Sequence, residues 1–214
     1  MSEKPIQEQF RKYVNPLKIP DGHCASCAFN TYLLLMGYIK PAEAEAFEPG
    51  GAPFKKFGDW FYKKFMLDTE NNVILSFSVT STKNQTIKDF EEFVSSEILN
   101  NTKPGEAVII CLDEGTHWYN AYHSPDKKVI FIDSQTGIEF NVYGSFLYDD
   151  TTIKVIIPKE EVIKEYLADV LPKIKETQKL MYQPKGGKKM RKQKKRKTNK
   201  KKIIKKKTKK HRRL

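Results

Sequence analysis

Apolar residues recur every three or four positions in several parts of this chain, which is the period of one face of an α-helix. The first such segment begins at or just before a pair of cysteines and ends near Gly37, a residue type that commonly stops helices. Pro172 should kink or split the last segment, because proline has no backbone N–H for the helical hydrogen bonds. The pattern predicts helices over 25–38, 54–66, 87–99 and 159–180.

After residue 106 the pattern changes to short β-branched or aromatic runs, separated by turn residues. These runs predict strands over Ala107–Leu112, Trp118–His123, Val129–Asp133, Ile138–Val142 and Ile153–Ile157. Because short turns join antiparallel neighbours, we expect a single antiparallel sheet. Helices first and a sheet second indicate an α+β domain of two layers, in which the N-terminal helices pack on the sheet.

The charge of the chain is concentrated at its C-terminal end. Of its 39 Lys and Arg residues, 19 lie in 185–214, which contains no Asp or Glu; residues 1–184 carry 20 basic and 26 acidic side chains, a balance of −6. This excludes a body that binds nucleic acid by its overall charge. The chain is thus expected to comprise a polar lead-in over 1–20, a domain over 21–184 and a basic tail over 185–214.

The tail consists almost entirely of Lys, Arg, Gln, Asn and Thr, so it cannot repay the entropy of folding and should be disordered alone. Its charges predict binding to DNA or RNA without base specificity. A nuclear-import signal is the competing interpretation, while a purely solubilising tail is less favoured because acidic residues solubilise better. The residues of the dense clusters singled out for binding are Lys192, Lys194, Lys195, Arg196, Lys197, Lys205, Lys206 and Lys207.

The sequence also bears on compartment. No apolar run approaches the roughly 20 residues of a membrane span, and the first residues lack the apolar core of a secretory signal. Three cysteines, Cys24, Cys27 and Cys111, are too few and odd in number for a disulfide scaffold. We therefore expect free thiols, a reducing intracellular location and no membrane partner.

The candidate chemistry begins with the first two cysteines. Cys24 and Cys27 lie at a helix start, where unpaired N–H groups and the helix dipole lower a thiol pKa and can hold an oxyanion. The hairpin predicted after His117 brings its open ends together, which places Asp133 beside that imidazole. The residues thus predict a Cys–His–Asp triad in which either cysteine is the nucleophile. A zinc site is the alternative, built from the two cysteines and two of His23, His117 and His123, but no second closely spaced ligand pair supports it.

Two motifs resemble the papain-fold toxin and deamidase domains of bacterial polymorphic toxins. His23-Cys24-Ala25-Ser26-Cys27-Ala28 is similar to their Asn-Cys-x-x-Cys helix start. His117-Trp118-Tyr119-Asn120 and Asp133-Ser134-Gln135-Thr136-Gly137 are similar to their His-x-x-Asn strand and Asp-Pro-Gln-Thr-Gly strand end. The resemblance covers roughly 15–142 and implies a papain-like fold with Cys24 as nucleophile, His117 as base, Asp133 as orienting carboxylate and Gln135 as support. His23 and Ser134 depart from the family's asparagine and proline.

Other papain-like families resemble parts of the same helix start. Asp21-Gly22-His23-Cys24 is similar to ovarian-tumour-type deubiquitinases, whereas Cys24-Ala25-Ser26-Cys27 is similar to papain, in which the second cysteine reacts. Ala28 provides a small side chain one turn below Cys24, as in the first-cysteine families, and Asp21 and Gly22 form a turn suited to an oxyanion cradle. Cys24 is therefore favoured, with Cys27 as the alternative nucleophile.

These observations lead to a papain-like thiol hydrolase that acts on a protein substrate without a metal or other cofactor. Peptide or isopeptide hydrolysis and glutamine deamidation remain open, since both use a thiolate and an acyl-enzyme. The alternative is a non-enzymatic, nucleic-acid-associated virion protein with a degenerate papain-like domain. The tail is similar to the C-termini of many giant DNA virus proteins, which implies a virion or a host nucleus or cytoplasm as its location.

Overall fold

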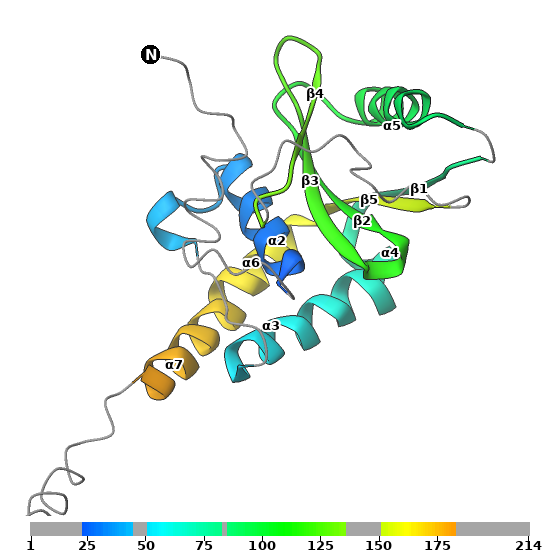
Figure 1. The fold of residues 1–214 in the computed structure, drawn as a ribbon. Helices are drawn as coiled ribbons and strands as arrows, with labels where there is room; N and C mark the ends of the chain where they lie inside the picture. Colours follow the sequence, from blue (N-terminus) through cyan, green and yellow to red (C-terminus); the bar gives the residue numbers. More distant parts are fainter. Residues whose placement is uncertain (1–22, 45–50, 83–84, 136–150, 183–214) are drawn as a thin grey trace, which may run out of the picture. The chain divides into compact units, whose positions relative to one another are not determined.

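The structure is a computed structural model that describes residues 23–44, 51–82, 85–135 and 151–182 (Figure 1). The chain divides into two compact units, Met1–Gln178 and Lys179–Leu214. The elements described below belong to the first unit, except for the end of the last helix. The lead-in over 1–20, the predicted strand Ile138–Val142 and the basic tail lie outside the described residues.

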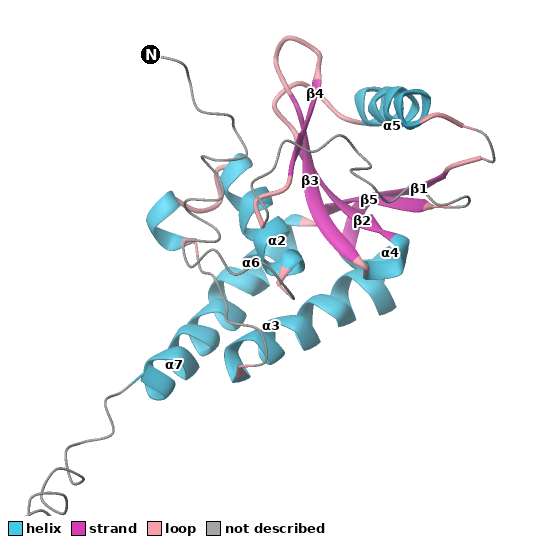
Figure 2. Ribbon diagram, viewed as in Figure 1, coloured by secondary structure: helices cyan, strands magenta, loops and turns pink. Residues whose placement is uncertain are grey.

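A five-stranded antiparallel sheet forms the centre of the first unit (Figure 2). Its strands lie in the order β1-β5-β2-β3-β4, so strands adjacent in the chain are neighbours only from β2 to β4. Together with the helices, this sheet confirms the predicted α+β fold. The strands are β1 (Val73–Thr80), β2 (Ala107–Leu112), β3 (His117–His123), β4 (Val129–Ile132) and β5 (Thr152–Pro158).

Strand β1 was not among the predicted strands, although its residues alternate as a strand requires. Val79 is buried, whereas Ser76, Ser78 and Thr80 on the other face are exposed. The strand pairs with β5 along its length. It is an edge strand of the described sheet.

Helices pack on both faces of the sheet, which corrects the expected two-layer arrangement. All six residues of β2 are buried, because its alternate side chains enter two different cores. Ile109 and Cys111 join the core that holds α2 (Cys24–Leu35), α3 (Ala52–Tyr62) and α6 (Glu160–Glu165). Val108, Ile110 and Leu112 join the core of α5 (Ile87–Asn101). The third layer follows from the unbroken apolar run of β2, since a strand of this kind must be covered on both sides.

An aromatic cluster holds α2 in place. The ring of Phe29, on α2, lies with its centroid 4.9 to 6.2 Å from five other aromatic rings. Such pairs each contribute about 0.5–1.5 kcal/mol beyond the burial of their area. The cluster fixes the helix that carries Cys24 against α3 and the helix after β5. The five rings belong to Phe57, Trp60, Phe61, Phe65 and Tyr166.

Two helices depart locally from α-helical geometry. The predicted helix over 54–66 is α3 followed by a π-helical turn over Lys63–Leu67. The helix after Pro158 consists of α6, a π-helical turn over Tyr166–Val170, and α7 (Leu171–Tyr182). The interruption expected at Pro172 is thus a π turn that ends at Val170, two positions before the proline. No helix among the described residues is long and apolar enough to cross a membrane.

Candidate active site

Cys24 is the first residue of α2, so its side chain lies at the N-terminus of the helix. The first hydrogen bond of the helical ladder runs from the Cys27 N–H to the His23 carbonyl at 3.1 Å. The N–H groups of Cys24, Ala25 and Ser26 therefore precede the ladder and carry the positive end of the helix dipole. Cys24 is partly exposed. Asp21 and Gly22, the residues predicted to shape an oxyanion cradle, lie outside the described residues.

His117 and Asp133 meet at the open end of the β3–β4 hairpin. His117 is the first residue of β3, and Asp133 directly follows β4. The pairing of Asn120 with Ile132 sets the register that brings the two side chains together. The His117 Nε2 atom lies 3.0 Å from the Asp133 Oδ2 atom. The carboxylate is 1% exposed and the imidazole 23%, so the pair has one buried and one accessible member.

The imidazole is also coupled to Cys24. Burial lowers the pKa of His117, but hydrogen bonds to Asp133 and Cys24 and the charges of both groups raise it more, to about 9. When Nε2 is protonated it donates to the Asp133 carboxylate, so Nδ1 is the nitrogen that can interact with the Cys24 thiol. The raised pKa of His117 thus reflects both the Asp133 carboxylate and the Cys24 thiol at the start of α2.

The Asp133 carboxylate is held on its other oxygen by the main chain. The backbone N–H of Gln135 donates to Asp133 Oδ1 at 3.0 Å, an Asx turn that restricts the rotation of the carboxylate. The sequence predicts a supporting role for Gln135, and this bond comes from its backbone. The ring of Tyr119 stacks on His117 with centroids 6.0 Å apart and planes 21° apart. Tyr119 was not among the residues predicted to act in the site.

A comparison with known proteins gives the family of this chain. The family model described as Shigella glutamine deamidase OspI matches residues 3–154, most of the chain. The chain belongs to this family. The matched region includes Cys24, His117 and Asp133, and family membership confirms the predicted resemblance to papain-like deamidase domains. No match was found among curated proteins.

Within this OspI-like domain, the other two cysteines are enclosed. Cys27 and Cys111 are each 1% exposed. Burial raises the pKa of the Cys111 thiol to about 12, so Cys111 stays a thiol in the core. Cys27 is buried on α2, one turn from Cys24. Cys24 is thus the cysteine that combines solvent access with a contact to His117.

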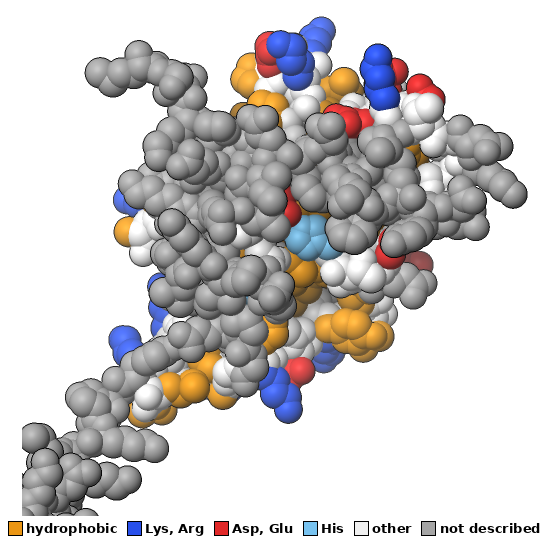
Figure 3. All heavy atoms as spheres, in the orientation of Figure 1, with side chains coloured by type: hydrophobic (Ala, Val, Ile, Leu, Met, Phe, Trp, Pro, Cys, Tyr) orange, Lys and Arg blue, Asp and Glu red, His pale blue; other side chains and the backbone are white. Residues whose placement is uncertain are grey.

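The zinc-site alternative is not assembled in the described part of the chain, where no three His, Cys, Asp or Glu side chains are grouped to hold a metal ion. His123 lies at the far end of β3 from His117, and its Nδ1 atom lies 3.0 Å from the Thr102 hydroxyl. Histidine atoms reach the surface beside hydrophobic side chains on the face drawn in Figure 3. The tail residues from Lys192 to Lys207 lie outside the described residues.

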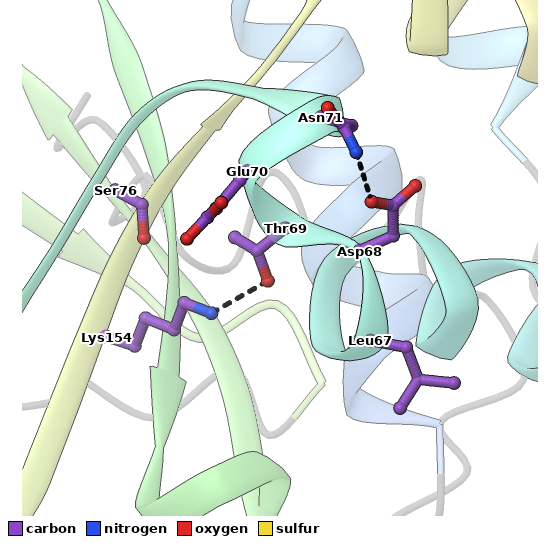
Figure 4. A pocket seen from close by; sticks show the side chains of 7 residues that line it. All are labelled: Leu67, Asp68, Thr69, Glu70, Asn71, Ser76 and Lys154. Atoms are coloured by element: carbon purple, nitrogen blue, oxygen red, sulfur yellow. Dashed lines mark hydrogen bonds between the residues drawn. The ribbon is translucent and has the colours of Figure 1, made fainter.

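A separate hollow of about 490 Å³ lies on the β1 and β5 side of the sheet (Figure 4). The Lys154 ammonium crosses it and donates to the Thr69 hydroxyl at 2.9 Å. Cys24, His117 and Asp133 do not line this hollow. It is polar and carries charges of both signs, from Asp68, Glu70 and Lys154.

Proposed function

We propose that this protein is a glutamine deamidase that hydrolyses the side-chain amide of glutamine in a protein substrate through Cys24, His117 and Asp133. The observation that carries the proposal is the imidazole of His117, which is hydrogen-bonded to a buried carboxylate and to a thiol at a helix N-terminus. Membership of the OspI-like family supports the deamidase assignment over other thiol hydrolases.

In the first half of the reaction, Nδ1 of His117 holds the Cys24 proton and the thiolate attacks the amide carbon. The amide oxygen becomes an oxyanion that the N–H groups at the start of α2 stabilise. Collapse of this intermediate breaks the C–N bond, and the imidazolium returns its proton to the nitrogen, which leaves as ammonia. A thioester between Cys24 and the substrate remains.

In the second half, His117 takes a proton from water as the water oxygen attacks the thioester carbon. The C–S bond then breaks, the sulfur recovers the proton from the imidazolium, and the glutamine side chain leaves as glutamate. Asp133 keeps Nε2 protonated and directs Nδ1 towards the sulfur. The net change is one amide and one water converted to one carboxylate and one ammonium ion, since the acid formed gives its proton to the ammonia.

Peptide or isopeptide hydrolysis by the same groups is the second candidate, since it differs only in the amine that leaves. A peptide in which a diazoketone replaces the glutamine side-chain amide separates the two. We expect this probe to alkylate Cys24 with loss of N₂, whereas the analogue one methylene shorter, derived from asparagine, should react far more slowly. Equal reaction of the two analogues, or alkylation of another cysteine, would contradict a glutamine-directed site.

We also propose that residues 185–214 tether the domain to nucleic acid through clusters such as Lys194–Lys197 and Lys205–Lys207. The support is the sequence alone: 19 basic and no acidic residues in thirty positions. With roughly 6–10 phosphate contacts, the affinity for duplex DNA should fall by about 10³–10⁵ between about 50 and 200 mM salt. Deletion of 185–214 should abolish this binding and leave the reactivity of Cys24 unchanged.

A body that still binds DNA after this deletion would contradict the tether. If, in addition, Cys24 were no more reactive than a free thiol, the non-enzymatic nucleic-acid-associated protein would be the better account. Binding measured by gel shift over a salt series, with thiol labelling of the same samples, makes both comparisons.

A further inference from the structure

Ser134 directly follows Asp133, at the position where the papain-fold toxin and deamidase domains have proline. Its side chain contacts α2. The Ser134 Oγ atom lies 2.5 Å from the Thr31 Oγ1 atom, although the two residues are 103 positions apart. Ser134 Oγ also donates to the Cys27 carbonyl at 3.5 Å. Both side chains are almost fully buried, at 0% for Thr31 and 2% for Ser134.

The two contacts on α2 fall on the turns that follow the nucleophile. Cys24, Cys27 and Thr31 are spaced three and four positions apart, so they lie along one side of the helix. Either hydroxyl can donate in the shorter bond, and the Cys27 carbonyl accepts the longer bond from Ser134. A buried hydroxyl pair of this kind is directional, and loss of one hydroxyl leaves the other as a buried polar group to satisfy.

Ser134 is also part of the Asx turn that holds the Asp133 carboxylate. Ser134 is the central residue of the turn closed by the bond from the Gln135 N–H to Asp133 Oδ1. Any shift of Ser134 relative to α2 therefore moves the carboxylate, and with it the imidazole, relative to the Cys24 sulfur. Prolyl geometry could restrict such a turn but could not bond it to the helix, since proline has no side-chain donor or acceptor.

We propose that Ser134 and Thr31 are positioning residues that set the separation between the nucleophile helix and the acid–base pair. The inference rests on the proposed function, because it assumes that Cys24 and His117 act together. Neither hydroxyl touches the reacting atoms in this scheme. Their effect is on the geometry of attack, where a displacement of about 1 Å can cost on the order of 100-fold in rate.

The test is the rate of Cys24 alkylation by iodoacetamide as a function of pH, measured on the full chain far below its melting temperature. Ser134→Ala and Thr31→Val should each lower the rate near neutral pH by about 10- to 100-fold. They should also move the His117-dependent part of the pH profile to lower pH, because the carboxylate then supports the imidazolium less well. Thr31→Ser keeps the hydroxyl and should keep both the rate and the profile.

Thr102→Val is the matched control. Thr102 is also a buried threonine, but its hydroxyl bonds to His123, which lies at the end of β3 opposite to His117. It should lower the melting temperature without a change in the alkylation profile. If Ser134→Ala or Thr31→Val were destabilised yet kept the wild-type rate and profile, the positioning role would be refuted. Should Ser134→Ala fail to fold, the comparison of Thr31→Val with Thr31→Ser decides the question.

The same measurement separates this inference from the proposed deamidation. Wild-type protein that fails to discriminate the glutamine and asparagine probes, but shows the predicted loss of alkylation in Thr31→Val, would refute the substrate and retain the positioning pair. Wild-type protein that discriminates the probes, with unchanged alkylation in both variants, would retain the deamidase and refute the pair. Wild-type Cys24 with no reactivity that depends on His117 would refute both.

Discussion

The two ends of strand β3 carry a histidine each, and the histidines differ in their partners. His117 faces a carboxylate and a thiol and is partly exposed. His123 is buried, with its Nδ1 atom on the neutral hydroxyl of Thr102. A charged partner supports an imidazolium, whereas a neutral hydroxyl ties a ring into the fold without that support. The two histidines therefore differ in chemistry because different elements pack against the two ends of β3.

The largest expected effect comes from removal of each ring in turn. His117→Ala should lower the rate of glutamine hydrolysis by at least about 10⁴-fold, because the triad acts as a unit. His123→Ala should instead cost about 1–3 kcal/mol of unfolding free energy, since it removes a buried ring and its hydrogen bond to the Thr102 hydroxyl. Ammonia release and chemical denaturation of both variants test this. Similar losses of activity in the two variants would remove the distinction between the ends of the strand.

The next effect concerns the carboxylate that distinguishes His117. Asp133→Asn keeps the shape of the side chain but supports the imidazolium poorly, so we expect a loss of about 10²–10⁴-fold in the rate of glutamine hydrolysis. Asp126→Asn changes an exposed carboxylate in the turn between β3 and β4 and should leave that rate unchanged. Steady-state kinetics of the two asparagine variants give the comparison. An active Asp133→Asn enzyme would mean that the contact to Asp133 is structural only.

A smaller effect appears in the dependence of stability on pH. The pKa of His117 is raised from 6.5 to about 9 in the folded protein. The folded state therefore holds this proton more tightly than the unfolded chain, and the resulting stability is fully present below about pH 6.5 and lost as the pH rises through about 9. Urea titrations from pH 6 to 10 should show this loss in the wild type and less of it in Asp133→Asn. A wild-type stability that is flat over that range would contradict the raised pKa.

The smallest effect is expected from the neutral partner at the other end. Thr102→Val removes the hydroxyl that bonds His123 and the Ile98 carbonyl, so it should destabilise the fold by about 1–3 kcal/mol. Neither the rate of glutamine hydrolysis at saturating substrate nor its pH profile should change. A shift of the catalytic pH profile in this variant would show that the two ends of β3 are coupled.

The sequence predicted much of this site because its signals are local. The position of Cys24 follows from a helix start, and the meeting of His117 and Asp133 follows from a hairpin with its turn between them. Strand β1 was missed because its apolar positions alternate with serines, and such an alternation is weak evidence until the pairing with β5 is known. The third layer was missed because periodicity identifies α5 but not the face of the sheet that it covers.

Contacts between distant residues were out of reach for the same reason. The bond between Thr31 and Ser134 joins a helix and a strand end that share no local pattern. Only the serine in place of the family's proline marked this position in the sequence. Whether Cys24 or Cys27 is accessible depends on how α2 is rotated about its axis against the aromatic cluster, which a CxxC spacing does not determine.

The central claim is that Cys24 is a nucleophile activated by His117, and the most direct test is the labelling rate of each cysteine by iodoacetamide near neutral pH in the intact chain. We predict that Cys24 is labelled stoichiometrically and much faster than a free thiol, that Cys27 and Cys111 remain protected, and that His117→Ala removes most of the excess rate while His123→Ala does not. Equal labelling of the three cysteines, faster labelling of Cys27, or a Cys24 rate that is independent of His117 would contradict the claim.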